Sequence, residues 1–172
     1  EITHIIKKSS WKPKSSILRH VNKARNEGLR TVALQPLACH AALAGFKRVK
    51  NYAFNFSETH LVQQVELFSN EFHCFGVIDN DDRVCAAILE AQVNSVKLLL
   101  AWDQSEWGKT YSSVDYLLYS RIDSAFSAGM EYVDMGTVSD NGRIIREGLV
   151  RHKENFSATP YLRNTYRLDL DR

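Results

Sequence analysis

The strongest constraint on the fold is a change of hydrophobic period in the middle of the chain. Three segments before residue 103 have strand length, strand composition and short turns between them, which predicts an antiparallel meander. These segments are 72–78, 83–91 and 95–102. After residue 113 the apolar side chains recur at helical spacing, until Gly129 ends the helix. The centre of the chain therefore predicts three strands followed by a helix.

The second half predicts a crossover connection. Tyr132–Met135 reads as a short strand, 143–150 as a helix and 161–170 as a closing strand. A strand–helix–strand unit after a meander predicts a mixed, mainly antiparallel sheet flanked by helices, in the α/β (α+β) class. We expect the Tyr132–Met135 strand at the centre of that sheet.

The N-terminal third predicts helices and short strands in alternation. Strands are expected at 1–6 and 31–34, and helices at 15–26, at 36–46 and from Ser57 onward. A chain of 172 residues has the length of one domain, so we expect a single domain over 1–172. Within it, 1–56 is the N-terminal segment and 57–172 the core. Because the chain opens on Glu1 and not on methionine, we expect a fragment of a longer protein.

Composition excludes several classes of protein. The 22 basic and 20 acidic residues leave a formal charge of +2, which gives no electrostatic case for DNA binding or a membrane surface. No run approaches the roughly 20 apolar residues that a membrane-spanning helix needs. The 3 cysteines are odd in number and form no CxxC pair, which favours reduced thiols and a cytoplasmic location.

The standard motifs of phosphate, nucleotide and metal chemistry are missing from the sequence. It contains no GxxxxGKS/T loop, no GxGxxG after a strand, no HExxH and no GxSxG. The 6 histidines have no metal-ligand spacing. Asp79–Asp82 lacks the glycine and the distal glutamate of a calcium loop and is typical of a hairpin turn. We therefore expect no metal site.

Two segments are more informative about chemistry. Gly129–Gly136 combines a helix end, a short strand and Asp134 at the strand's C-terminal end, where ligands gather in open α/β sheets. Gly148–Phe156 places Lys153 between a helix end and the last strand, where its ammonium could neutralise a phosphate or an oxyanion. Spacing alone favours a solvated loop lysine, whose removal would leave stability nearly unchanged.

At these two segments the sequence resembles a known family. Gly129–Gly136 is similar to the G-x-x-x-x-D-F-G strand, and Gly148–Ser157 to the G-L/I-x-x-F/Y-K-x-x-F-G segment, of the FemAB-like and BioF2-like branch of the GNAT acyltransferase superfamily. Arg19–Leu29 resembles the basic helix of the same branch. The resemblance covers most of 71–170 and one helix before it.

The sequence departs from that pattern in three places. Met135 stands at the aromatic position of the strand motif, His152 stands where an aromatic residue usually precedes the lysine, and Ser157 replaces a glycine. In addition, the loop 103–113 lacks the glycine-rich pyrophosphate loop of ordinary GNAT enzymes, as is common in the FemAB-like branch. FemAB-type transferases carry two such domains in tandem, and this chain has room for one.

The resemblance implies roles for particular residues. Lys153 would stabilise the transition state or a phosphate. Asp134 would handle a proton or orient the substrate, unless it only hydrogen-bonds backbone at the strand end. The implied acyl-CoA (acetyl-CoA) contacts are Leu100, Ala101, Trp102 and Ser112. The implied substrate contacts are Trp107, Tyr111 and Arg146, although aromatic packing is an alternative role for the first two.

The resemblance implies a transferase. The reaction would move an acyl or aminoacyl group from an activated donor such as acyl-CoA to an amine of a sugar, a peptide or a cell-wall or glycan precursor. Because an amine can attack the donor directly, no covalent enzyme intermediate is required. Alternatives are a non-catalytic GNAT-like binding domain and an aminoacyl-tRNA-dependent FemAB-type transferase. In that last case tRNA is a partner. The sequence is compatible with a monomer or a homodimer.

Overall fold

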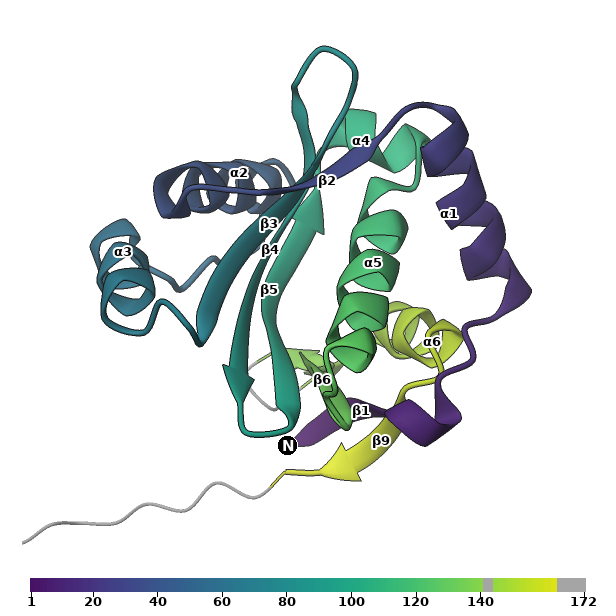
Figure 1. The fold of residues 1–172 in the computed structure, drawn as a ribbon. Helices are drawn as coiled ribbons and strands as arrows, with labels where there is room; N and C mark the ends of the chain where they lie inside the picture. Colours follow the sequence, from purple (N-terminus) through teal and green to yellow (C-terminus); the bar gives the residue numbers. More distant parts are fainter. Residues whose placement is uncertain (141–143, 164–172) are drawn as a thin grey trace, which may run out of the picture.

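The chain folds around one seven-stranded sheet (Figure 1). The computed structural model describes residues 1–140 and 144–163. The strands are β1 (Ile2–Lys7), β2 (Arg30–Ala33), β3 (Phe72–Ile78), β4 (Val84–Val93), β5 (Val96–Gln104), β6 (Tyr132–Thr137), β7 (Ser139–Asp140), β8 (Ile144–Ile145) and β9 (Thr159–Leu162). The helices are η1 (Lys8–Ser10), α1 (Ser15–Asn26), α2 (Pro36–Val49), α3 (Glu58–Leu67), α4 (Glu106–Thr110), α5 (Ser113–Ser127) and α6 (Glu147–Asn155).

The sheet is mixed and mainly antiparallel, which confirms the fold class predicted from the sequence. Its strand order is β2-β3-β4-β5-β6-β1-β9, and β7 and β8 form a separate pair. Only β5 and β6 run parallel among the paired strands that the structure describes. We expected β6 at the centre of the sheet, but the middle position belongs to β5 and β6 is the next strand. Only two strands, β1 and β9, lie on the outer side of β6.

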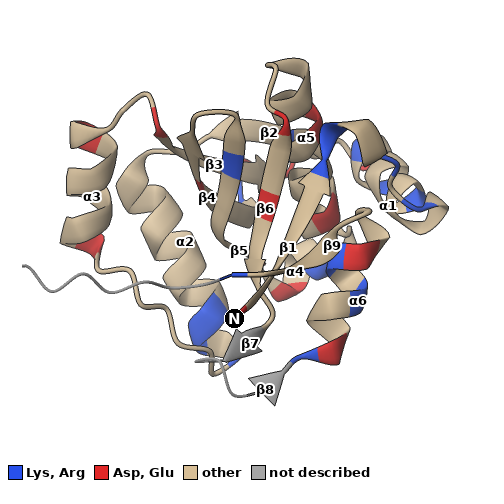
Figure 2. Cartoon of the chain, turned by 90° about the horizontal axis from the view of Figure 1, so that it is seen from below, with Lys and Arg blue, Asp and Glu red and all other residues tan. Residues whose placement is uncertain are grey.

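Helices cover both faces of the sheet and divide the core in two. Figure 1 shows α2 and α3 on one face and α1, α5 and α6 on the other. The larger apolar cluster lies under α1 and α5, where Leu117 and Ile122 are fully buried. The smaller cluster packs Leu43 of α2 and Leu61 of α3 against β3, β4 and β5. The charged residues are of both signs and are spread over several helices, with α1 largely basic (Figure 2).

Local chemistry explains where the elements begin and end. The acidic segment after β3 is a hairpin turn, as expected, because the Asp79 carboxylate accepts hydrogen bonds from the backbone N–H groups of Asp81 and Arg83. Ser57 caps α3 by accepting a hydrogen bond from the backbone N–H of His60. The turn after α1 requires Gly28, whose φ of +78° lies in the left-handed region.

The C-terminal part differs from the sequence-based expectation. The helix expected at 143–150 is α6, which runs from Glu147 to Asn155, and residue 143 lies outside the described residues. The closing strand covers only Thr159–Leu162, while 164–170 also lie outside them. The helix therefore includes the charged run Arg151–Lys153. Of these three residues only Lys153 is buried. A charged run that reads as a solvated loop is therefore a half-buried helix.

Two further features bear on the general character of the protein. In the part of the chain that the structure describes, none of the helices has the length and apolar character needed to cross a bilayer. The three cysteines, Cys39, Cys74 and Cys85, are buried free thiols.

The short helix α4 allows a direct test of the packing around β4. A Cβ atom at Gly108 would lie 2.2 Å from the Cys85 carbonyl oxygen and 2.4 Å from Ser113 Oγ. Gly108→Ala should therefore lower the free energy of unfolding by about 1–3 kcal/mol. Gly45→Ala in α2, where a Cβ meets nothing within 4 Å, should raise it by up to about 1 kcal/mol. Urea unfolding of both variants measures this, and equal effects would contradict the packing described.

Candidate functional site

The site begins where two parallel strands separate. β5 and β6 pair only from Val96 and Tyr132 to Leu98 and Asp134. Beyond this point β6 continues to Thr137 in antiparallel pairing with β1, whereas β5 continues to Gln104 paired with β4 on its other side. Among the described residues, no strand pairs with the β6-facing edge of β5 beyond Leu98. The peptide groups of this edge therefore face an opening in the sheet.

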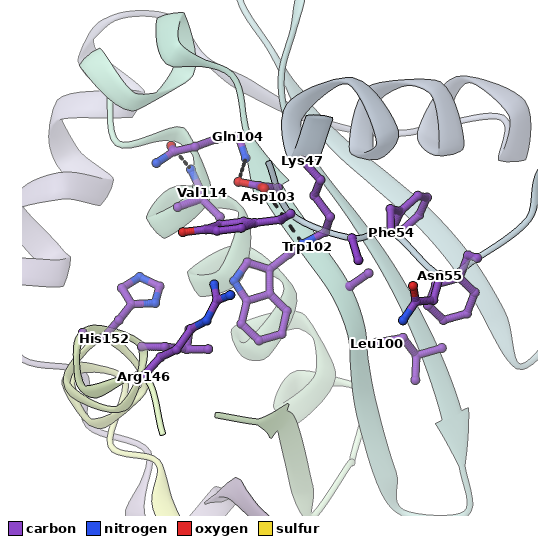
Figure 3. A pocket seen from close by; sticks show the side chains of 16 residues that line it. Lys47, Phe54, Asn55, Leu100, Trp102, Asp103, Gln104, Val114, Arg146 and His152 are labelled. Carbon is purple, nitrogen blue, oxygen red and sulfur yellow. Dashed lines mark hydrogen bonds and ion pairs between the residues drawn. The ribbon is translucent and has the colours of Figure 1, made fainter. Parts of the chain in front are cut away.

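A cavity of about 650 Å³ lies over that opening (Figure 3). Its floor is the last part of β5, and its walls come from the end of α2, the segment 52–56 that follows α2, the start of α5, and α6. The residues that line it are Lys47, Tyr52, Ala53, Phe54, Asn55, Phe56, Leu100, Ala101, Trp102, Asp103, Gln104, Val114, Arg146, Gly148, Leu149 and His152. Four elements far apart in the sequence therefore contribute to one concave surface.

The cavity combines aromatic rings with an excess of positive charge. The Arg146 guanidinium lies 4.4 Å from the centre of the Tyr52 ring, and both residues line the cavity. Figure 3 shows Arg146 beside Trp102. At the far wall the single carboxylate of Asp103 is shared by two lysines: Lys50 pairs with Oδ1, and Lys47 Nζ lies 3.9 Å from Oδ2. Such a lining favours ligands that carry an anionic group next to an apolar one.

Burial affects the protonation of the cavity lysine. Desolvation lowers the pKa of Lys47; Asp103 opposes this shift, and the neighbouring cations Lys50 and Arg146 reinforce it. An anionic ligand beside Lys47 would favour its charged form.

Lys153 is buried beneath the cavity and does not lie in a surface loop. It has 0% exposure and lies in the last turn of α6. Its ammonium donates hydrogen bonds to the carbonyl oxygens of Gly136 (2.6 Å) and Thr137 (2.8 Å) and lies 5.3 Å from the centre of the Trp102 ring. Burial lowers the pKa of Lys153 to about 8, against an upward effect of Asp134. The surface loop on which we based the expectation of unchanged stability is therefore not found; Lys153 is a buried helix residue.

Asp134 holds the end of β6 in place. Its Oδ1 accepts hydrogen bonds from the Thr3 hydroxyl on β1 and, at 2.7 Å, from the backbone N–H of Gly136. Gly136 has a φ of +74°, a conformation that favours glycine. Asp134 is thus engaged in the local hydrogen bonding that the sequence left open as one of its two roles, and it does not line the cavity.

The structure brings some of the other expected site residues together and separates the rest. Leu100, Ala101, Trp102 and Arg146 all line the cavity. Trp107 and Tyr111 lie outside it and pack edge to face, 5.1 Å between ring centres, while the Trp107 indole donates a hydrogen bond to Asp79. Ser112 also lies outside the lining, at the N-terminal cap of α5.

The N-terminus of α5 is already occupied by groups of the chain itself. The Gln104 side-chain oxygen accepts hydrogen bonds from the backbone N–H of Val114 (3.1 Å) and from the Ser113 hydroxyl (3.2 Å). Asp115 places a carboxylate in the same first turn. A helix N-terminus normally attracts anions, but here the Val114 N–H already donates to Gln104, and the Asp115 carboxylate adds a negative charge in the same turn. An anionic ligand group would instead meet the cationic side chains Lys47 and Arg146.

Sequence reasoning missed two parts of the site. The segment 52–56 carries alternating aromatic residues, a signal for partial burial that was available in the sequence. His152 was noted only as a departure from a pattern; it lines the cavity and is hydrogen-bonded to Asp115, 37 residues earlier. No local spacing marks such a contact.

Comparison with known proteins defines the fold. No family model matches the sequence, and a search of curated proteins found no match. Among solved structures, FemX superposes with a TM-score of 0.73 at 9% identity, covering 92% of this chain and 59% of that one. L-PGS from Bacillus licheniformis superposes with a TM-score of 0.70 at 12% identity, covering 92% of this chain and 57% of that one.

A shorter protein matches over nearly its whole length. The aminoglycoside acetyltransferase meta-AAC0020, from an uncultured soil metagenomic sample, has a TM-score of 0.56 at 16% identity, covering 84% of this chain and 99% of that one. The chain thus spans less than three fifths of FemX and L-PGS but nearly all of the acetyltransferase. The chain therefore shares its fold with these three proteins, and the likeness to FemX is the one that the FemAB-like sequence motifs led us to expect.

The buried ammonium gives a pH-dependent prediction. Lys153→Met keeps an unbranched side chain but removes the charge and both hydrogen bonds. Because the pKa of Lys153 in the folded protein is about 8, below its ordinary 10.5, the unfolded chain binds more protons between these values. The unfolding free energy of the wild type should therefore rise relative to that of the variant as pH increases from about 8 to 10.5, and the difference should be constant below about 8.

Urea unfolding of the two proteins at several pH values in this range measures the difference between their unfolding free energies. The contributions of the other titratable groups are the same in both proteins and cancel in that difference. A difference that stays constant across the range would contradict the assignment. At neutral pH the variant should be less stable by about 1–3 kcal/mol, because two buried carbonyl groups lose their donor.

Proposed function

We propose that the protein transfers an acyl or aminoacyl group from an activated donor to an amine. The observation that carries this proposal is the opening between β5 and β6. There Leu100–Trp102 form the floor of the cavity and, within the described residues, have no partner strand on the side that faces β6. An extended donor chain can hydrogen-bond to such an edge as an added strand would. The GNAT-like fold supports the same reaction class.

The donor would lie along the open edge of β5. A thioester such as acetyl-CoA, or an aminoacyl ester of tRNA, presents an activated carbonyl at the end of a long polar arm. Trp102 offers a flat apolar surface for that arm, and Lys47 and Arg146 offer charges for a phosphate on the donor or on the acceptor. Acyl-CoA use and a cytoplasmic location, where both donor types are made, are parts of this proposal.

Lys153 and Asp134 would act from below the reacting groups. Lys153 is bonded to the carbonyls of Gly136 and Thr137, so its first effect is to fix the C-terminal end of β6 on one side of the opening. Its charge also lies behind the Trp102 ring, where it would favour negative charge that develops on the donor carbonyl oxygen. Asp134 would orient this strand end through Gly136.

The acceptor would be an amine on a molecule that carries a phosphate or a carboxylate. The shared carboxylate of Asp103 leaves positive charge in excess at one wall, and the aromatic segment 52–56 provides a surface for a sugar ring or an apolar side chain. Amino sugars, their nucleotide-linked forms and peptides with a free amino group fit this description. A tRNA would be a partner only as the carrier of an aminoacyl donor.

A two-donor assay tests the proposal. Labelled acetyl-CoA and a mixture of labelled aminoacyl-tRNAs are each incubated with the protein and a panel of amino sugars, nucleotide-linked amino sugars and peptides, and products are identified by mass spectrometry. We expect an N-acylated product from one donor. Failure of both donors with every amine would overturn the proposal, and ligand binding without transfer would favour the non-catalytic alternative.

Two tryptophans provide a matched pair of variants. Trp102→Ala removes the ring at the open edge and should lower kcat/KM by about 10–10², because the donor is no longer held in line with the amine. Trp107→Ala removes a ring that lies outside the cavity and is bonded to Asp79, and it should leave kcat/KM within about threefold. Equal losses in the two variants would show that Trp102 has no specific part in the site.

A further inference from the structure

A carboxylate held between two histidines lies at the junction of three helices. Asp115 in the first turn of α5 is 8% exposed. Its Oδ1 lies 2.7 Å from Nε2 of His152 on α6, and its Oδ2 lies 2.6 Å from Nδ1 of His20 on α1. Burial alone would raise the pKa of Asp115, but the contacts with His152 and His20 bring the pKa below its ordinary value. Asp115 is therefore an anion that accepts from both imidazoles.

This pairing determines the state of the His152 ring. Because an ionised carboxylate only accepts hydrogen bonds, Nε2 of His152 must carry the proton in this contact. In the neutral ring the other nitrogen, Nδ1, then holds a lone pair. Nδ1 has no hydrogen-bond partner within the described ranges 1–140 and 144–163. The ring is also packed edge to face against Phe156, at 5.4 Å between ring centres, which fixes its plane.

The two histidines differ in what they face. The His152 side chain is 27% exposed and lines the cavity together with Trp102 and Arg146 (Figure 3). The His20 side chain is 45% exposed and is absent from the cavity lining. Only one of the two imidazoles bonded to Asp115 can therefore meet a ligand in the cavity.

We propose that His152 is the general base that takes the proton from the attacking amine, with Asp115 as the residue that positions it. This inference rests on the proposed acyl transfer. An amine acceptor is largely an ammonium at neutral pH and cannot attack a carbonyl until it loses a proton. An imidazole with a free lone pair, fixed by a buried carboxylate at the wall of the reaction cavity, is suited to accept it.

The proton and electron balance is complete without a further reactant. The ammonium gives one proton to Nδ1 of His152, and the freed nitrogen lone pair forms the C–N bond with the donor carbonyl. The C–S bond of a thioester, or the C–O bond of an aminoacyl ester, breaks with its electron pair leaving on the sulfur or oxygen. That atom takes the second proton from the nitrogen, and the imidazolium returns its proton to water.

Several charged and titratable groups surround the proposed base. Asp115 of α5 contacts the His152 ring, and His20 of α1 contacts the other oxygen of the same carboxylate. Lys153 is the residue that follows His152 in α6. The other groups on the cavity wall are Lys47 of α2, Tyr52 of the following segment, Asp103 of β5 and Arg146 at the start of α6.

The experiment compares His152→Gln with His20→Gln as a matched control. Glutamine at 152 can still donate a hydrogen bond to Asp115 but cannot take up a proton near neutral pH, whereas His20 contacts the same carboxylate from outside the cavity. Both variants are assayed with whichever of acetyl-CoA and alanyl-tRNA the wild type accepts. Each is tested with two acceptors: glucosamine, an ammonium in part at neutral pH, and hydroxylamine, which is already a neutral nucleophile there.

We expect His152→Gln to lose about 10²–10⁴ in kcat/KM with glucosamine, to lose the acid limb of the pH–rate profile, and to lose less than about tenfold with hydroxylamine. His20→Gln should stay within about threefold of the wild type on both acceptors. If His152→Gln fails to fold, His152→Gly assayed with added imidazole replaces it, and imidazole should restore transfer to glucosamine.

Each outcome bears on a separate claim. Equal losses with the two acceptors, retention of the acid limb, or no rescue by imidazole would overturn the role of His152 while leaving the proposed acyl transfer intact. A wild type that transfers from neither donor would overturn the proposed function, and with it this inference.

Discussion

The parallel pairing of β5 with β6 stops after Leu98 and Asp134, and the shape of the site depends on that early end. Three groups fix the end of β6 where its pairing with β5 stops. The hydroxyl of Thr3 bonds the Asp134 carboxylate, Gly136 adopts a left-handed turn, and the buried ammonium of Lys153 donates to two carbonyls at the strand end. A lysine without exposure is costly to bury, so its hydrogen bonds must be formed in the folded state. The opening in the sheet is therefore built into the fold.

The surroundings of the opening decide which chemistry it can support. A helix N-terminus can bind an anion, but at the N-terminus of α5 the Val114 N–H already donates to the Gln104 side chain. Positive charge is instead supplied by side chains on the cavity wall, where Lys47 and Lys50 share the carboxylate of Asp103. Side chains on flexible stems can adapt to differently placed phosphates or carboxylates, whereas a helix end cannot. This arrangement suits a transferase whose donor does not follow the usual pyrophosphate path.

Much of the fold could be predicted from the sequence, because strand-length apolar segments between short turns indicate β3, β4 and β5, and apolar residues at helical spacing indicate α5. The residues of the site were harder to predict. Trp102 and Arg146 could be named from a resemblance, but Lys153 was misread, since a charged run near a helix end usually faces water and the two carbonyls that bind it lie 16 and 17 residues away. The contact of His152 with Asp115 joins helices that are separate in the sequence, and no periodicity encodes it.

The central claim is that the unpaired edge of β5 binds the acyl donor, and amide hydrogen exchange tests it most directly. The protein is measured alone, with S-ethyl coenzyme A, and with an amide-linked aminoacyl-adenosine, two unreactive mimics of the proposed donor types. We expect one mimic to slow amide exchange in 99–104 of β5 and to leave the exchange rates of the edge strand β2 (Arg30–Ala33) unchanged. Slowed exchange only outside 99–104, or no change with either mimic, would contradict it.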